Sequence, residues 1–274
     1  MNIIDARMRA PFGAEAELLR GNRTLGKSKT FGFGCARSAI EASPEMLIQE
    51  MDDAHIGIGI ITGRGRFADR NGELLAFSDL FPGRFRVLPY LDPAREQFDA
   101  EIRGLARHPA VKGFSIQYYS DGATCYGALD AKAMKLYESV AASGLPLMVT
   151  VSGHTLPYLD SQIITELDHV AVNFPQMSII ITHGGWPWVT EAIGLAFRRP
   201  NVYLIPDCYC TNGPGAQEYV QAANYMIPDK ILFGSSYPLI SQGQMMEHYV
   251  RRAGFREEVL PKVMGENART LFKL

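Results

Sequence analysis

The chain has 274 residues, of which 47% are hydrophobic and 20% are charged, a composition that is typical of globular proteins and excludes wholesale disorder. Its net charge is −2 at neutral pH, whereas nucleic-acid-binding domains usually carry a strong basic excess, so we expect no nucleic-acid partner. The sequence has no apolar run of transmembrane length and no secretory signal pattern, so we expect a cytoplasmic protein with no membrane partner and with reduced cysteines.

Short apolar runs rich in β-branched residues alternate with amphipathic stretches of helical length. The apolar runs are too continuous for half-exposed strands, which predicts a parallel sheet that is buried on both faces. We expect eight strands, at residues 2–6, 56–62, 85–91, 111–117, 145–151, 178–182, 202–205 and 230–233.

Helical patterns lie between these runs. Ser43 followed by Pro44 is typical of a helix start, and Gly144 is typical of a helix end. We expect helices over residues 46–54, 93–107, 130–143, 159–174, 189–197, 216–226 and 242–253, and a final pair over 256–274.

Eight β-then-α units predict an α/β fold in which residues 1–274 form a single (β/α)₈ TIM barrel. The alternative is a doubly wound open sheet, but the sequence has neither its phosphate-binding glycine fingerprint nor a Walker loop or G-x-S-x-G turn. The segment 11–42 is long, contains glycine and lacks strong periodicity, so we expect a loop that lies over the barrel mouth.

In such a barrel, functional side chains stand at the carboxyl ends of the strands. The first strand ends with Asp5, Arg7 and Arg9, and because side chains in a strand alternate with period two, we expect all three to point into the barrel. Further candidate side chains stand at or just after later strand ends: Tyr118, His183, Trp186, Asp207, Tyr209, Ser236 and Tyr237.

Five short segments occur along the chain in a fixed order. They are the opening Ile-Ile-Asp-Ala, Thr182-His183-Gly184-Gly185 before Trp-Pro, Pro200-Asn201-Val202-Tyr203, Leu232-Phe233-Gly234-Ser235-x-Tyr237-Pro238 and Gly265-Glu266-Asn267-Ala268. In this order they resemble the amidohydrolase-related family of the metal-dependent hydrolases, which includes aromatic decarboxylases and lactone hydrolases. The resemblance implies a TIM barrel, a hydrolase or carboxy-lyase activity and assembly into homo-oligomers.

The chain departs from this family where the family holds its metal. The family has His-x-His at the end of strand one, where this chain has Arg7-x-Arg9, and it has an aspartate where this chain has Ser236. The strand-five histidine of the family corresponds to Thr150, and His154 follows four residues later. A guanidinium group cannot ligate a cation and repels it, so we expect no metal cofactor at the family's usual site.

One alternative keeps a divalent metal in a rearranged site formed by His183, His154 and Asp207 or a cysteine. Cys208 and Cys210 are spaced so that both could face one way with His183, although no second Cys-x-Cys accompanies them. Cys210 could also be a nucleophile, since neighbouring arginines would favour its thiolate.

Arg7 and Arg9 could bind a carboxylate or phosphate through bidentate hydrogen bonds, or could form ion pairs with Asp5 or Asp207. His183 is the candidate general acid or base, because an imidazole titrates near neutral pH. Asp207 would orient it.

The remaining candidates are substrate-binding residues. Tyr118, Trp186, Tyr209 and Tyr237 would line a pocket for a planar substrate, or instead cap the barrel core. Ser236 would donate or accept a hydrogen bond, since a serine needs a partner base for acid–base work.

These observations predict an enzyme that acts on a small carboxylated molecule. The reaction would be hydrolysis of a lactone or a related C–O or C–N bond, or a lyase step such as decarboxylation or hydration. The alternative is a catalytically inactive homologue in which the same arginines bind an anionic effector.

Overall fold

The strands form the ring of a barrel in the computed structural model, which describes residues 2–10, 29–65, 70–95, 98–118, 127–153, 156, 159 and 161–274. Within these residues the strands pair in parallel, in a three-stranded sheet of order β1-β2-β3 and a four-stranded sheet of order β4-β5-β6-β7. Their bounds are β1 Ile3–Met8, β2 Ile56–Thr62, β3 Phe85–Leu88, β4 Phe114–Gln117, β5 Leu147–Thr150, β6 Ile179–Thr182 and β7 Val202–Ile205.

Isolated bridges join the two sheets into a ring. Val87 pairs with Val111 between β3 and β4, and Leu204 pairs with Ile231 after β7. The eighth predicted strand, 230–233, is therefore an extended segment with a bridge at Ile231 rather than a regular strand. This segment closes the barrel, because Phe233 O accepts a hydrogen bond from Ala6 N at 2.9 Å.

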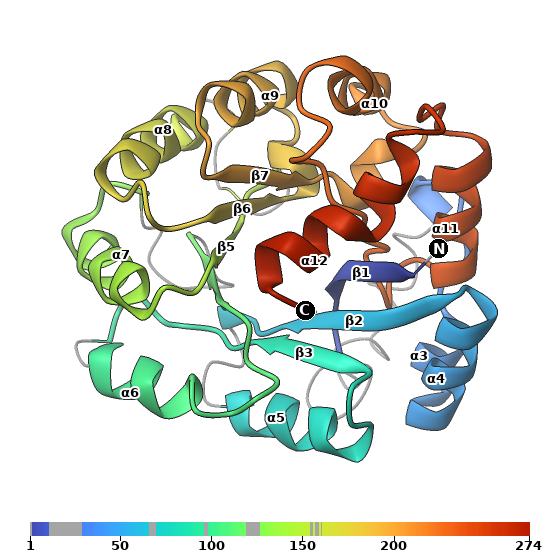
Figure 1. Cartoon of the computed structure of the whole chain (residues 1–274), viewed down its shortest axis with the longest axis horizontal. Helices are drawn as coiled ribbons and strands as arrows, with labels where there is room; N and C mark the ends of the chain where they lie inside the picture. Colours follow the sequence, from blue (N-terminus) through green and yellow to red (C-terminus); the bar gives the residue numbers. More distant parts are fainter. Residues whose placement is uncertain are drawn as a thin grey trace.

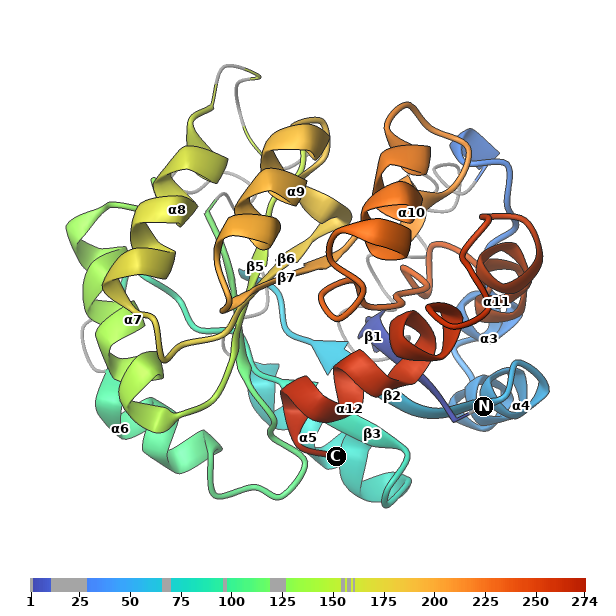
Figure 2. The ribbon, with the colours of Figure 1, turned by 45° about the horizontal axis from the view of Figure 1, so that its top comes forward.

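Helices surround the ring on its outside, except for the last one, which lies across one end of it (Figures 1 and 2). Most of them coincide with the predicted stretches, but α3 and α5 were not predicted; α5 begins with Asn71-Gly72, a pair typical of turns. The helices are α3 Arg37–Glu41, α4 Pro44–Asp53, α5 Asn71–Leu80, α6 Phe98–Leu105, α7 Ala131–Ser143, α8 Ile163–Asn173, α9 Val189–Arg198, α10 Ala216–Tyr225, α11 Gln242–Arg251 and α12 Asn267–Phe272, with a π-helical turn, Lys262–Glu266, before α12.

Two predicted helix signals are confirmed. The Ser43 hydroxyl accepts a hydrogen bond from Met46 N at the start of α4, with Pro44 in its first turn. Gly144 ends α7 in the left-handed conformation with φ of 69°.

The barrel interior is an apolar cluster with one end closed by α12. It contains Ile4 and Ala6 of β1 together with inward residues of the other strands, and α12 adds Ala268 and Phe272. Figure 1 shows α12 lying across the ring. Because α12 follows Gly265, which faces Asn2 before β1, it covers the amino ends of the strands and leaves polar chemistry to their carboxyl ends.

Part of the predicted loop 11–42 can be placed. Residues 11–28 lie outside the described residues, and the remainder contains α3. Phe31 packs edge-on against Tyr209 with ring centroids 5.5 Å apart, so this segment contacts the loop that follows β7. Among the described residues, no helix is long and apolar enough to cross a membrane.

Candidate functional site

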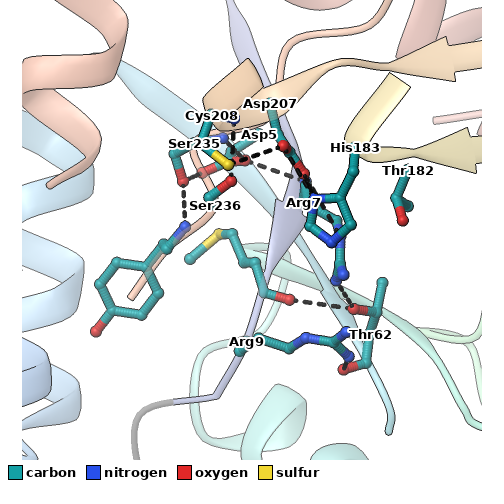
Figure 3. Close-up of polar contacts among 12 residues, drawn as sticks. Asp5, Arg7, Arg9, Thr62, Thr182, His183, Asp207, Cys208, Ser235 and Ser236 are labelled. Atoms are coloured by element: carbon teal, nitrogen blue, oxygen red, sulfur yellow. Dashed lines mark hydrogen bonds and ion pairs between the residues drawn. The ribbon is translucent and has the colours of Figure 1, made fainter. Parts of the chain in front are cut away.

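His183 and Asp207 meet at the carboxyl ends of the neighbouring strands β6 and β7 (Figure 3). His183 Nδ1 lies 3.1 Å from Asp207 Oδ1 and 2.8 Å from Oδ2. The Asp207 side chain is fully buried, whereas the His183 side chain is 20% exposed. A carboxylate only accepts, so Nδ1 is assigned the proton and Nε2 carries the lone pair. The structure thus brings the two predicted catalytic residues together, and the proton-transfer role of His183 stays a prediction.

The backbone at this mouth adopts conformations that L-residues disfavour. His183, Asp207 and Ser236 have φ of 59°, 45° and 60°, each in the left-handed region, which costs of order 1–3 kcal/mol per non-glycine residue. Such residues persist only where the surrounding structure over-determines them, and they concentrate at functional sites. Their gathering at three adjacent strand ends marks the mouth as the candidate site.

Arg7 lies between β2 and the dyad. Its Nη1 donates to Thr62 Oγ1 at 2.6 Å, and its Nε lies 4.0 Å from Asp207 Oδ2. The side chain is 6% exposed. Of the two ionic partners considered from the sequence, Asp207 therefore faces Arg7, and Asp5 does not form an ion pair with it among the described residues.

Arg9 is held by the end of β2. Its Nη1 donates to the carbonyl oxygens of Thr62 and Gly63 at 2.7 and 2.6 Å, and its side chain is also nearly buried. Arg7 and Arg9 thus converge on Thr62, which was not singled out from the sequence, because a threonine at a strand end is also what β-propensity alone produces.

The prediction that Asp5 points into the barrel with the arginines is wrong. The pairing of β1 with β2 shifts register between Asp5 and Met8, so the period-two alternation breaks there. Asp5 faces outward instead, where Ser235 and Gln242 donate to its carboxylate. Burial raises the pKa of this carboxyl group, and hydrogen bonds from Ser235 and Gln242 oppose the rise.

A row of polar side chains continues the mouth across the second sheet. Gln117, Thr150 and Thr182 end three adjacent strands and are aligned in register. Thr150 and Thr182 each stand two residues after an interior methionine or isoleucine, so they face the same way. Gln117 Oε1 accepts from Gly65 N at 3.2 Å. Each of them is a polar residue that ends an apolar run, which is the only pattern in the sequence that could have predicted their place at the mouth.

An aromatic cluster adjoins His183. Trp186 and Tyr209 stack with centroids 4.9 Å apart and an interplanar angle of 17°, and the Tyr209 ring meets His183 edge-on at 5.7 Å. Trp186 Nε1 donates to Pro214 O at 3.2 Å. Burial raises the pKa of Tyr209, which keeps its phenol protonated. Both residues therefore lie beside His183 at the carboxyl ends of the strands, and their role in lining a substrate pocket stays a prediction.

The other two tyrosines of that set, Tyr118 and Tyr237, lie away from the mouth, which corrects the expectation that they line a substrate pocket. Tyr118 is fully buried and its hydroxyl lies 2.9 Å from that of Tyr137 on α7. Because Gln117 faces the mouth, its neighbour Tyr118 faces the helices. The Tyr237 hydroxyl lies 2.7 Å from Ser38 Oγ on α3.

Ser236, which follows the closing segment, contacts the two cysteines' loop after β7. Ser236 Oγ accepts from Cys208 N at 3.2 Å, and Cys208 Sγ donates to Asp207 Oδ1 at 3.3 Å. Burial raises the pKa of both thiols, that of Cys210 to about 12. The thiols are therefore protonated at neutral pH, which argues against Cys210 as a nucleophile.

The residues present do not fit the metal of the resembled family. His183, Asp207 and Cys208 offer donor atoms within 4.8 Å of one another, and His154 lies outside the described residues. Cys208 is a protonated thiol, and the Arg7 guanidinium lies 4.0 Å from Asp207 Oδ2. A divalent ion here would have few anionic ligands and a fixed positive charge beside it.

Comparison with known proteins supports the fold and identifies a family. The Amidohydrolase family model, Amidohydro_2, matches residues 41–274, a range that begins after Arg7 and Arg9. No curated protein sequence matches. An uncharacterised TIM-barrel protein, Bb4693 from Bordetella bronchiseptica, is 27% identical, with 100% of this chain and 99% of that chain covered and a TM-score of 0.87.

Two more distant structures share the fold. 2,6-Dihydroxybenzoate decarboxylase from Rhizobium is 15% identical, with 100% of this chain and 99% of that chain covered and a TM-score of 0.71. A putative 2-pyrone-4,6-dicarboxylic acid hydrolase from Pseudomonas putida is 16% identical, with 99% and 97% covered and a TM-score of 0.72. The predicted α/β TIM barrel is confirmed.

Proposed function

Because the chain belongs to the amidohydrolase family, we propose that it is an enzyme that acts on a small carboxylated substrate, as a hydrolase or a carboxy-lyase, without the family's usual divalent metal. The observation that carries this proposal is the contact between His183 and Asp207. An imidazole that is partly exposed and backed by a buried carboxylate is suited to proton transfer at neutral pH.

His183 Nε2 is the proton-transfer atom in this proposal. Asp207 fixes the proton on Nδ1 and stabilises the imidazolium that forms when Nε2 takes a second proton. Among the residues that the structure describes, none forms a hydrogen bond with Nε2. In this proposal, Nε2 therefore faces the substrate. General acid–base catalysis of this kind contributes roughly 10²- to 10⁴-fold in rate.

Arg7 and Arg9 hold the carboxylate of the substrate. A guanidinium matches a carboxylate with two parallel N–H···O bonds and is permanently charged. Both arginines stand at the strand end where the family usually places its metal ligands, so they supply positive charge to an anion that develops in the transition state.

The two reaction classes use His183 Nε2 in opposite orders. In hydrolysis, Nε2 takes a proton from water as the water oxygen bonds to the acyl carbon, and it returns that proton to the leaving oxygen or nitrogen as the C–O or C–N bond breaks. In a carboxy-lyase step, Nε2 first takes a proton from solvent; the bond to the carboxylate then breaks, CO₂ leaves, and Nε2 delivers its proton to the carbon that keeps the electron pair. An inactive anion-binding protein would need no buried acid behind His183.

The test is turnover by untagged, chelator-treated protein on a panel of hydroxylated benzoates, pyrone carboxylates and lactones, followed by ultraviolet absorbance and CO₂ release. We expect turnover of at least one compound with no stoichiometric transition metal by mass spectrometry, and its loss in Arg7→Met and His183→Asn. Turnover that requires added zinc or manganese would overturn the metal-free mechanism. Tight binding without turnover of any compound would favour the anion-binding protein instead.

A further inference from the structure

We propose that Asp5 is a positioning residue that holds a bulge in β1 and thereby directs the Arg7 side chain at the His183–Asp207 pair. The effect of Asp5 on turnover rests on the proposed function, whereas its effect on the bulge and on the position of Arg7 does not. It assigns a role to a buried carboxylate that neither proton transfer nor substrate binding uses.

Hydrogen bonding on both edges of β1 locates the bulge. On the β2 side, Asp5 pairs with Gly59 and Met8 with Ile61, so three residues advance against two. On the closing side, the amides of Ala6 and Arg9 donate to Phe233 O and Tyr237 O, both at 2.9 Å. In a regular strand the amides that face one neighbour are two residues apart, so one residue is extra.

The bulge turns two consecutive side chains inward. Ala6 belongs to the apolar barrel interior, and Arg7 reaches Thr62 and Asp207 at the mouth. Met8 returns to the outer core. Without the extra residue, period-two alternation would send Arg7 outward with Asp5, so the position of the Arg7 guanidinium depends on the bulge.

Two glycines make room for this path. A Cβ at Gly59 would collide with Met8 Sδ on the outside of the strand. A Cβ at Gly234 would lie only 2.7 Å from Arg7 Cβ on the inside. Neither glycine has a positive φ, so close approach by the bulged strand, and not backbone conformation, accounts for their lack of a side chain.

The Asp5 carboxylate ties this bulge to the closing segment. Its Oδ1 accepts from Arg7 N at 3.1 Å, the amide inside the bulge, and from Ser235 N at 2.9 Å. Its Oδ2 accepts from Ser235 Oγ at 2.5 Å and from Gln242 Nε2 at 3.0 Å. Asp5 is fully buried. A buried carboxylate is costly to keep, and this one is held by four donors that fix the bulge against its neighbour.

The Ser235 contact extends this effect to the rest of the mouth. Ser235 Oγ also accepts from Tyr237 N at 2.9 Å. The residue between them, Ser236, is left-handed and accepts from Cys208 N, next to Asp207. Asp5 therefore sets the relative position of the Arg7 and Asp207 strand ends.

The experiment compares Asp5→Asn with Ser38→Ala. Asn keeps the shape of Asp, but its NH₂ group must face two of the four donors. Ser38→Ala is the matched control, because it removes a buried hydroxyl bonded to Glu50 and Tyr237 on the other side of the closing segment. If Asp5→Asn does not fold, Ser235→Ala removes one donor and the link to Tyr237 while leaving the carboxylate in place.

Two readouts separate positioning from general stability. Crystal structures of the variants test the bulge directly: we expect the Arg7–Thr62 hydrogen bond to be lost in Asp5→Asn and kept in Ser38→Ala. Kinetics then test the consequence: Asp5→Asn should lower kcat/KM by about ten- to a hundredfold in the wild-type background and by less than about twofold in Arg7→Met.

An unchanged bulge and Arg7 position in Asp5→Asn would overturn the proposal, and so would a kinetic effect of full size that persists in Arg7→Met. If no substrate is found, the proposed function fails but the crystallographic comparison still decides the role of Asp5.

Discussion

The two ends of the barrel use polar side chains in opposite ways. At the amino ends of the strands, the Asn201 amide donates to the carbonyl oxygens of Ala171, Phe174 and Met177 at 3.0–3.2 Å. Asn267 does the same toward Pro228 and Ile231 at 2.9 and 2.8 Å. These bonds supply donors to carbonyl oxygens at helix ends and turns. At the carboxyl ends, charged groups face one another and the backbone is left-handed at three residues.

The segments that resemble the amidohydrolase-related family therefore contain two kinds of residue: residues that stabilise the amino ends of the strands and residues that stand at the mouth. Asn201 and Asn267 belong to motif segments as clearly as His183 does, yet their donors are used up in stabilising bonds within the chain. His183 is partly exposed, and among the described residues only its Nδ1, and not its Nε2, has a hydrogen-bond partner. A substitution at the amino ends should therefore lower stability and spare turnover, and one at the mouth should do the reverse.

The largest expected effect is on turnover. His183→Asn should lower kcat by about 10²- to 10⁴-fold, because the proton-transfer group is lost. The free energy of unfolding should stay within about 1 kcal/mol of wild type or rise, since Asn tolerates the left-handed conformation better than most residues do. Steady-state kinetics and urea unfolding measure the two quantities. A variant with normal kcat and much lower stability would place His183 with the structural residues.

At the other end, Asn201→Ala should lower the free energy of unfolding by about 2–4 kcal/mol, because buried carbonyls lose their donor. We expect kcat per folded molecule to be unchanged. Urea unfolding measures the loss, and Asn224→Ala, which removes a partly exposed amide bonded to Gly254 O and Arg256 N, is the control with a small effect. A fall in kcat at full folding would show that the two ends are coupled.

Only those features of the two barrel ends that depend on local patterns could be predicted from the sequence. Strand order, the caps at Ser43 and Gly144, and the dyad follow from periodicity and from the rule that barrel chemistry sits at strand ends. The outward turn of Asp5 could not be predicted, because a one-residue bulge leaves no trace in a pattern of period two. The position of Tyr118 depended on register, which the sequence leaves open by one residue.

Thr62 and Gln242 show the other limit. Each gains its role from a partner far along the chain, Arg7 for Thr62 and Asp5 for Gln242. A side chain that acts through such a contact has no local signature, so it is found only once the strands are assembled.

Arg9 tests whether one residue can both stabilise the fold and bind the substrate. Its Nη1 is bonded to two carbonyl oxygens at the mouth, so Arg9→Met should cost about 1.5–3 kcal/mol of stability through lost charge-assisted bonds. If it also holds the substrate carboxylate, KM should rise more than kcat falls. Kinetics and urea unfolding on one preparation measure both. A stability loss with unchanged KM would make Arg9 a structural residue alone.

The smallest expected effect concerns the ion pair of Asp168 on α8 with Arg199, which precedes Asn201. Arg199 Nε donates to Asp168 Oδ1 at 2.5 Å and Nη2 donates to Oδ2 at 3.0 Å. These bonds hold the pKa of the Asp168 carboxyl below its ordinary value. Since the folded pKa is the lower one, the stabilisation is complete above the ordinary Asp pKa of about 3.9 and is lost as pH falls through the folded value.

Because both side chains are partly exposed, solvent screens this pair and its stabilisation should be small. Asp168→Asn should therefore be less stable than wild type near neutral pH, and the difference should shrink below the ordinary Asp pKa. Paired urea unfolding curves across this range measure it. Turnover at neutral pH should be the same in both proteins, because this pair, like Asn201, supports the amino end of the barrel. A difference in stability that persisted in strong acid would mean that packing, and not charge, joins Asp168 to Arg199.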